Sequence, residues 1–215
     1  MKGMFTSLLF MAGLAVGLPA MAAAPTGWYV GANGGQSDSD LRGSDIDMEL
    51  TAAGFVSSTS VDHTDMGYKV FGGYQFNPFI AVEGGYVDLG ENSFTTVVTS
   101  APVGFMTGTA TGKYKTSDGF YLDAVGMVPI GERFSLLGRL GAYSMRVKLD
   151  VSGPAASLSD SSTDSDLHAG LGGAWHITDN WEARAEFDHF RKVGDPDVTG
   201  EADVDLWSLG LVFRF

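Results

Sequence analysis

The final segment of the chain, residues 203–215, alternates between two kinds of side chain. Every second position is apolar, and these positions are Trp207, Leu209, Leu211, Phe213 and Phe215. The positions between them are Leu206, Ser208, Gly210, Val212 and Arg214. Because successive side chains of a β-strand point to opposite faces, this segment has one wholly apolar face and one mixed face ending in an arginine. A strand lying between lipid and a polar lumen has this pattern, and an ordinary edge strand of a soluble sheet is the alternative.

The same alternation recurs upstream. We expect earlier strands at residues 28–35, 66–76, 79–89, 119–128, 134–149, 167–177 and 181–191. Short turns at 77–78, 129–133 and 178–180 alternate with polar segments at 36–64, 90–118, 150–166 and 192–202, which we expect to be long loops. This rhythm predicts an all-β fold, an eight-stranded antiparallel up-and-down transmembrane β-barrel with its long loops outside the cell. A soluble lipocalin-like barrel is the alternative fold.

The N-terminus has the three parts of a secretory signal peptide. Lys2 supplies the positive start, residues 4–18 are mostly apolar, and small residues at 19–23 form a cleavage site. We therefore expect a signal peptide at 1–23 and a barrel domain at 24–215. No second apolar run approaches the roughly 20 residues of a spanning helix, so a membrane-spanning fold of this chain must be a closed barrel.

Composition excludes several functions. The chain has no cysteine, which removes disulfide scaffolds, thiolate zinc sites and cysteine nucleophiles. Its net charge of −13 argues against binding nucleic acid, whose phosphates require basic residues. No nucleotide-binding or metalloprotease motif is present, so we expect neither a cofactor nor a metal.

Several short motifs resemble the OmpA transmembrane domain family. They are Phe71-Gly-Gly-Tyr-Gln-Phe-Asn-Pro78, Val82-Glu-Gly-Gly-Tyr86, Gly138-Arg-Leu-Gly141, Trp175-His-Ile-Thr178 and Ser208-Leu-Gly210 with Arg214. The resemblance implies an outer-membrane location in contact with membrane lipid and lipopolysaccharide, and periplasmic chaperones during export. Family members commonly carry a C-terminal peptidoglycan-binding domain. Since this chain stops at its last strand, we expect no such domain and no anchoring to the cell wall.

The C-terminal residues Ser208, Gly210, Phe213 and Phe215 resemble the signal by which the barrel-assembly machinery recognises its clients. The family resemblance also implies paired charges inside the barrel, at positions that match Glu83, Glu186 and Arg214. Successive side chains of a strand alternate between its two faces, a rule that we call strand parity. It places four further charged residues on the inner faces, namely Lys69, Asp123, Arg139 and Arg184. Since unpaired charges in a narrow interior are costly, we expect these seven residues to form a salt-bridged plug. A narrow ion path is the alternative.

Enzymatic activity is not expected. The four histidines are His63, His168, His176 and His189, and no serine follows any of them at the spacing of a deacylase. His168 is the best acid–base candidate by location, near Asp166 and Asp188, but the sequence pairs no nucleophile with it. Catalytic residues are therefore not assigned.

The expected loops carry most of the negative charge. Their acidic residues include Asp38, Asp40, Asp45, Asp47, Glu49, Asp62, Asp150, Asp160, Asp164 and Asp166. We interpret them as solvated surface, with divalent-cation binding as an alternative. The predicted function is an OmpA-like barrel with a structural and surface-interaction role. A porin-like channel and an adhesin or receptor are alternatives, and the sequence does not identify a ligand for the loops.

Overall fold

The computed structural model describes residues 26–40, 42–152, 157–195 and 200–215, so the predicted signal peptide lies outside the described residues. The elements are β1 (Gly27–Ser39), α1 (Gly43–Ala52), β2 (Val56–Asp62), β3 (Thr64–Asn77), β4 (Ile80–Asp88), β5 (Glu91–Ser100), β6 (Gly108–Ile130), β7 (Phe134–Ser152), β8 (Ser157–His176), β9 (Trp181–Asp195) and β10 (Gly200–Arg214). The described helix is too short and too polar to cross a bilayer.

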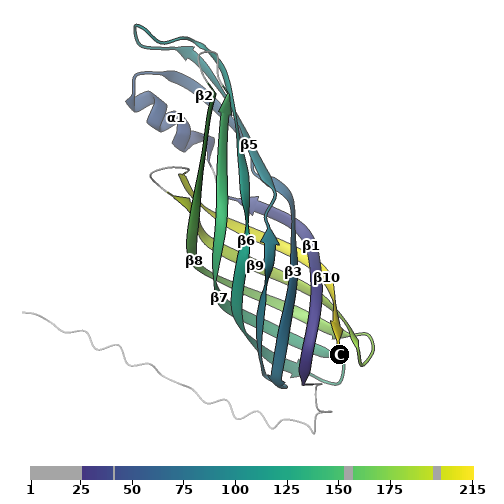
Figure 1. The fold of residues 1–215 in the computed structure, drawn as a ribbon. Coiled ribbons are helices and arrows are strands. Elements are labelled where there is room, and N and C mark those ends of the chain that lie inside the picture. Colours follow the sequence, from purple (N-terminus) through teal and green to yellow (C-terminus); the bar gives the residue numbers. More distant parts are fainter. Residues whose placement is uncertain (1–25, 41, 153–156, 196–199) are drawn as a thin grey trace, which may run out of the picture.

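Eight of the strands close into an antiparallel barrel, as predicted (Figure 1). Their order around the barrel is β1, β3, β4, β6, β7, β8, β9 and β10, and β10 pairs with β1 to complete the circle. The predicted parity also holds. On β1, for example, Trp28 and Val30 are exposed to the outside, whereas Tyr29 and Asn33 are buried in the lumen.

Large apolar residues cover the outer wall. Phe120, Leu171 and Leu209 are each 70% exposed, an arrangement that suits a wall in contact with lipid rather than water. Aromatic side chains are also exposed near the short-turn end, and they are Trp28, Phe76, Phe79, Phe134, Trp175, Trp181 and Phe215. Their shared position matches the aromatic girdle of a membrane interface.

The four long segments expected to be loops are largely strands, and this expectation was wrong. The first contains the end of β1, α1 and β2, and the second contains β5 and the start of β6. The third is taken up by the ends of β7 and β8, and the described part of the fourth by the ends of β9 and β10. Beyond the bilayer both faces of a strand contact water. The alternation of apolar and polar side chains therefore disappears from the sequence, although the hydrogen bonds between the strands continue.

These strand continuations build a sheet beyond one side of the barrel mouth, at the end opposite the short turns (Figure 1). β5 pairs with the upper part of β6, and β2 pairs with β5. Helix α1 lies against this sheet (Figure 1). None of its residues is buried, so its attachment does not depend on the buried apolar stripe of an ordinary amphipathic helix.

Asp47 attaches α1 to β2. Its Oδ1 accepts hydrogen bonds of 2.7 Å from the hydroxyls of Ser57 and Thr59, and its Oδ2 accepts one of 3.0 Å from the Thr59 amide. The hydrogen bonds from Ser57 and Thr59 lower the pKa of the Asp47 carboxyl below its usual value.

We expect the contact between α1 and β2 to be pH-dependent. Because the folded pKa of Asp47 is depressed, the stabilisation is complete above the unfolded pKa of about 3.9 and is lost as the pH falls through the folded value. The Thr59 amide resonance should therefore titrate in this acidic range in wild-type protein and not in Asp47→Asn. The matched control Asp45→Asn should keep the titration. A Thr59 titration that persists in Asp47→Asn would contradict this account.

Candidate functional site: an ion-pair network in the lumen

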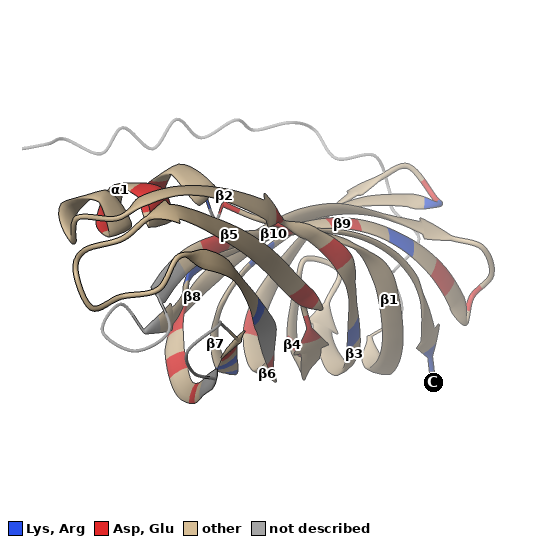
Figure 2. Cartoon of the chain, turned by 90° about the horizontal axis from the view of Figure 1, so that it is seen from above, with Lys and Arg blue, Asp and Glu red and all other residues tan. Residues whose placement is uncertain are grey.

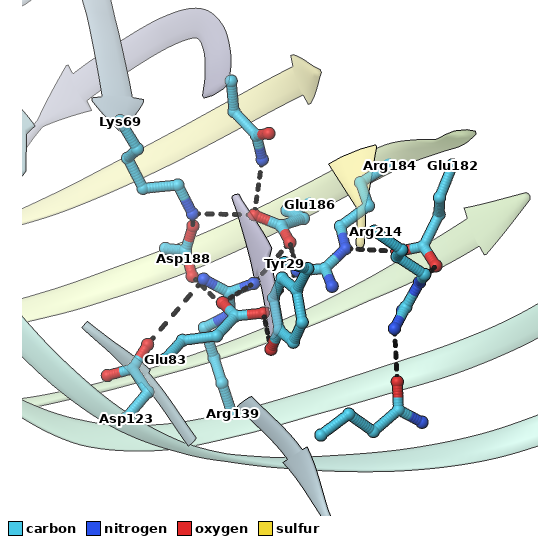
Figure 3. A network of polar contacts seen from close by, with 12 residues as sticks. Tyr29, Lys69, Glu83, Asp123, Arg139, Glu182, Arg184, Glu186, Asp188 and Arg214 are labelled. Carbon is cyan, nitrogen blue, oxygen red and sulfur yellow. Dashed lines mark hydrogen bonds and ion pairs between the residues drawn. The ribbon is translucent and has the colours of Figure 1, made fainter. Parts of the chain in front are cut away.

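The inward positions of six barrel strands bring buried charges together in the lumen (Figure 3). They are Lys69, Glu83, Asp123, Arg139, Glu182, Arg184, Glu186, Asp188 and Arg214. All seven residues expected from the sequence lie in this set. Glu182 and Asp188 were not selected from the sequence, although they share the inward parity of Arg184 and Glu186 on β9.

Glu186 lies at the centre of the network. The Lys69 ammonium is 2.8 Å from its Oε2, and the Asn33 side-chain amide donates to the same oxygen at 2.6 Å. The Arg139 guanidinium pairs with its Oε1, and Arg184 Nη1 is 3.6 Å from that atom. One carboxylate therefore holds together cations from β3, β7 and β9.

The two central arginines connect opposite walls. Arg184 Nη1 is 2.5 Å from Glu83 Oε1, and its Nε is 2.6 Å from Glu182 Oε1. Arg139 approaches Glu83 at 3.5 Å and Asp188 at 3.4 Å. Since β4 lies across the lumen from β9, the Arg184–Glu83 pair spans the interior directly (Figure 3).

The network continues to both ends of the charged region. Towards the short turns, Arg214 Nη2 is 2.7 Å from Glu182 Oε2, and its Nη1 donates to Gln75 Oε1 at 2.5 Å. Towards the outside, Lys69 also pairs with Asp188. The described set holds four lysine or arginine side chains and five carboxylates, so most of its charge is compensated locally.

His168 contacts a different carboxylate from those that the sequence suggested. Its Nε2 is 2.6 Å from Asp123 Oδ1, rather than bonded to Asp166 or Asp188. The ring stacks on Phe190, with centroids 4.7 Å apart and planes at 5°. His168 therefore bonds a carboxylate that also faces Arg139, at 3.7 Å, and extends the network to β8.

The remaining histidines lie elsewhere. His176 is 3.1 Å from Glu182 at the short-turn end, whereas His63 and His189 line a polar pocket of about 470 Å³ at the outer rim. His189 Nδ1 is 2.6 Å from Asp205 there. Among the described residues, no group of three or more metal-ligating side chains is positioned to hold a metal ion.

A layer of apolar side chains covers the network on the side away from the short turns. It consists of Val87, Leu89, Met145, Phe190 and Leu206, all of which are buried. Ser37 secures this layer by donating a hydrogen bond of 2.5 Å to the Leu89 carbonyl. The layer was not predicted from the sequence, although Val87, Met145, Phe190 and Leu206 share the inward parity of their strands and Leu89 directly follows β4.

The four residues of the expected assembly signal lie on both faces of β10. Ser208 is buried in the lumen, and a Cβ added to Gly210 would come within 2.0 Å of Asn33 Oδ1. Phe213 and Phe215 lie on the outer face, where their rings meet edge-on at 5.3 Å. Recognition by the assembly machinery stays a prediction.

Comparisons with known proteins identify the family. Residues 23–215 match the family model described as OmpA-like transmembrane domain. Outer membrane protein A of Shigella flexneri is 30% identical over 192 residues, and that of Escherichia fergusonii is 28% identical over 192. Each alignment covers 87% of this chain and 48% of the relative, so the chain spans about half the length of these curated relatives.

Solved structures of small outer-membrane proteins are also similar. Neisserial surface protein A shares 14% identity at a TM-score of 0.48, covering 88% of this chain and 98% of that one. Ail of Yersinia pestis shares 20% identity at a TM-score of 0.47, covering 89% and 100%. On the evidence of the family match, this chain belongs to the OmpA-like transmembrane domain family and is a β-barrel of the bacterial outer membrane.

Proposed function

We propose that this protein is a closed structural barrel of the outer membrane that presents a folded sheet at the cell surface. The observation that carries the proposal is the filling of the lumen by ion pairs that reach from wall to wall. An eight-stranded barrel is only wide enough for its interior to be filled by side chains. The apolar layer outside the network adds a second barrier, because an ion crossing it would lose its hydration.

The surface role is supported by the order of the extracellular part. Strands β2, β5 and the upper part of β6 pair into one sheet, and Asp47 of helix α1 is hydrogen-bonded to β2, so this region is one folded unit rather than a set of separate loops. Acidic residues mark α1 in Figure 2, and the neighbouring connection between β5 and β6 exposes Phe105 and Met106. A surface of this kind is suited to contacts with other molecules outside the cell.

Planar-bilayer recording of the refolded protein tests whether the lumen is closed. We expect a heat-modifiable shift in gel mobility, which reports a folded barrel, together with no discrete conductance steps. A porin reconstituted in the same bilayers checks the sensitivity of the recording. Reproducible steps of constant size from protein that passes the mobility check would contradict the closed barrel and favour a narrow pore.

A further inference from the structure

The outer face of β7 changes character along its length. Leu136, Leu140 and Ala142 face lipid, and the next outward positions after Ser144 are Arg146 and Lys148. Both basic side chains are exposed, and no carboxylate of the described residues lies within ion-pair distance of either. This is unlike the lumen, where every cation is paired.

The neighbours of these two cations leave them available. Asp118 lies directly opposite Arg146 on β6, but its Oδ2 accepts a hydrogen bond of 3.1 Å from Tyr86 on β4, on the side away from β7. On β8, the residues opposite Arg146 and Lys148 are Thr163 and Ser161, which supply hydroxyl groups. A guanidinium and an ammonium beside hydroxyls form a favourable environment for a phosphate group.

An apolar groove lies below this basic pair on the outer wall. It has a volume of about 510 Å³ and crosses β6, β7, β8 and β9. Small and apolar residues dominate its lining, which includes Ala124, Gly138, Leu140, Ala169 and Leu171 together with His189. Because this wall faces lipid, the groove is suited to a hydrocarbon chain.

The distance between Leu140, which lines the groove, and Arg146 matches the depth of one leaflet. Arg146 follows Leu140 by six positions, about 20 Å along a strand at roughly 3.3 Å per residue. A strand tilt of about 40° reduces this to a height of about 15 Å, half of a hydrocarbon core of about 30 Å. Phe134 lies six positions in the other direction, at the short-turn interface. Leu140 is therefore near mid-membrane, and Arg146 is at the outer headgroup level.

We propose that Arg146 and Lys148 bind a phosphate of a phosphorylated glycolipid of the outer leaflet, and that one of its acyl chains occupies the groove. The inference rests on the outer-membrane location and the outward orientation of the long strands, and it is independent of whether the lumen conducts. The two cations meet the anionic headgroup, and the small residues of the groove let the chain approach the wall closely.

Native mass spectrometry of the folded protein in nonionic detergent tests the proposal, with bisphosphorylated lipid A as the probe. We expect the double variant Arg146→Gln, Lys148→Gln to bind this lipid about tenfold more weakly than wild type, since each basic residue near an anionic surface contributes favourably. The matched control Arg42→Gln, Arg133→Gln removes the same charge elsewhere on the exposed surface and should bind as wild type does.

A groove variant and a comparison of three lipids identify the ligand. Gly138→Leu should weaken binding by filling the groove, and it should fold, because a Cβ there meets only Leu171 Cδ2, at 3.9 Å. Wild-type protein should prefer bisphosphorylated lipid A to its dephosphorylated form and to phosphatidylglycerol. Equal binding of all three lipids, or unchanged binding by the Arg146 and Lys148 double variant, would overturn the proposal.

Discussion

Replacing Glu186 by glutamine is expected to lower the free energy of unfolding by about 3–5 kcal/mol, the usual range when one partner of a buried ion pair is removed. The neutral side chain has nearly the same volume, so packing is retained while Lys69 and Arg139 lose their shared counter-charge. The measurement is the urea midpoint of the folded barrel in detergent, followed by its heat-modifiable gel mobility.

The control for this variant is Glu132→Gln, which makes the same chemical change on an exposed turn and should leave the midpoint unchanged. A second variant distinguishes the loss of ion pairs from a general failure of the barrel to fold. Combining Glu186→Gln with Lys69→Met removes one of the cations that share the Glu186 carboxylate, while Asp188 keeps its contact with Arg139, and it should recover part of the stability. A single Glu186 variant as stable as wild type would show that the network contributes little to the barrel.

The second large effect is expected at Gly35, on the inner face of β1. A Cβ there would lie 1.8 Å from the Trp207 carbonyl oxygen and 2.6 Å from the Ser208 Cα, so backbone atoms would have to move. The clash therefore disturbs the hydrogen-bonded pairing of β1 with β10, which closes the barrel. We expect Gly35→Ala to destabilise the protein by about 3 kcal/mol or to prevent closure, at the upper end of overpacking effects.

The neighbouring glycine is a matched control for this prediction. Gly34 points to the outside, and a Cβ added there meets no atom within 4 Å. Refolding yields of Gly35→Ala and Gly34→Ala can be compared by the fraction with heat-modifiable mobility. Equal yields and equal urea midpoints for the two variants would refute the steric argument.

Strand parity predicted the barrel because the two faces of each strand contact different solvents. Where lipid lies on one side and the lumen on the other, as along β10, side-chain polarity reports the direction of each residue. The same rule failed for residues 157–166, because both faces of that part of β8 lie outside the bilayer. The sequence therefore predicted the strands of the barrel well and missed their continuations beyond the barrel mouth.

For the lumen, parity predicted which charged residues face inward but not which would meet. Glu83 and Arg184 come from strands that are far apart in the sequence, and their contact depends on strand tilt and on side-chain reach across the barrel. The omission of Glu182 and Asp188 had a simpler cause. Both have inward parity on β9, so a complete count of inward charges would have included them.

The sheet beyond the barrel mouth reintroduces open strand edges, which barrel closure removes elsewhere in the fold. One is β2, which among the described strands pairs with β5 alone and whose Thr59 amide donates a hydrogen bond to Asp47. Another is the outer part of β8, which among the described residues pairs with β7 alone before β9 joins at His168. Asp160, Asp164 and Asp166 lie on this stretch. Their charges oppose the pairing of β8 with the same strand of a neighbouring molecule, so the acidity of this segment protects crowded copies from aggregation.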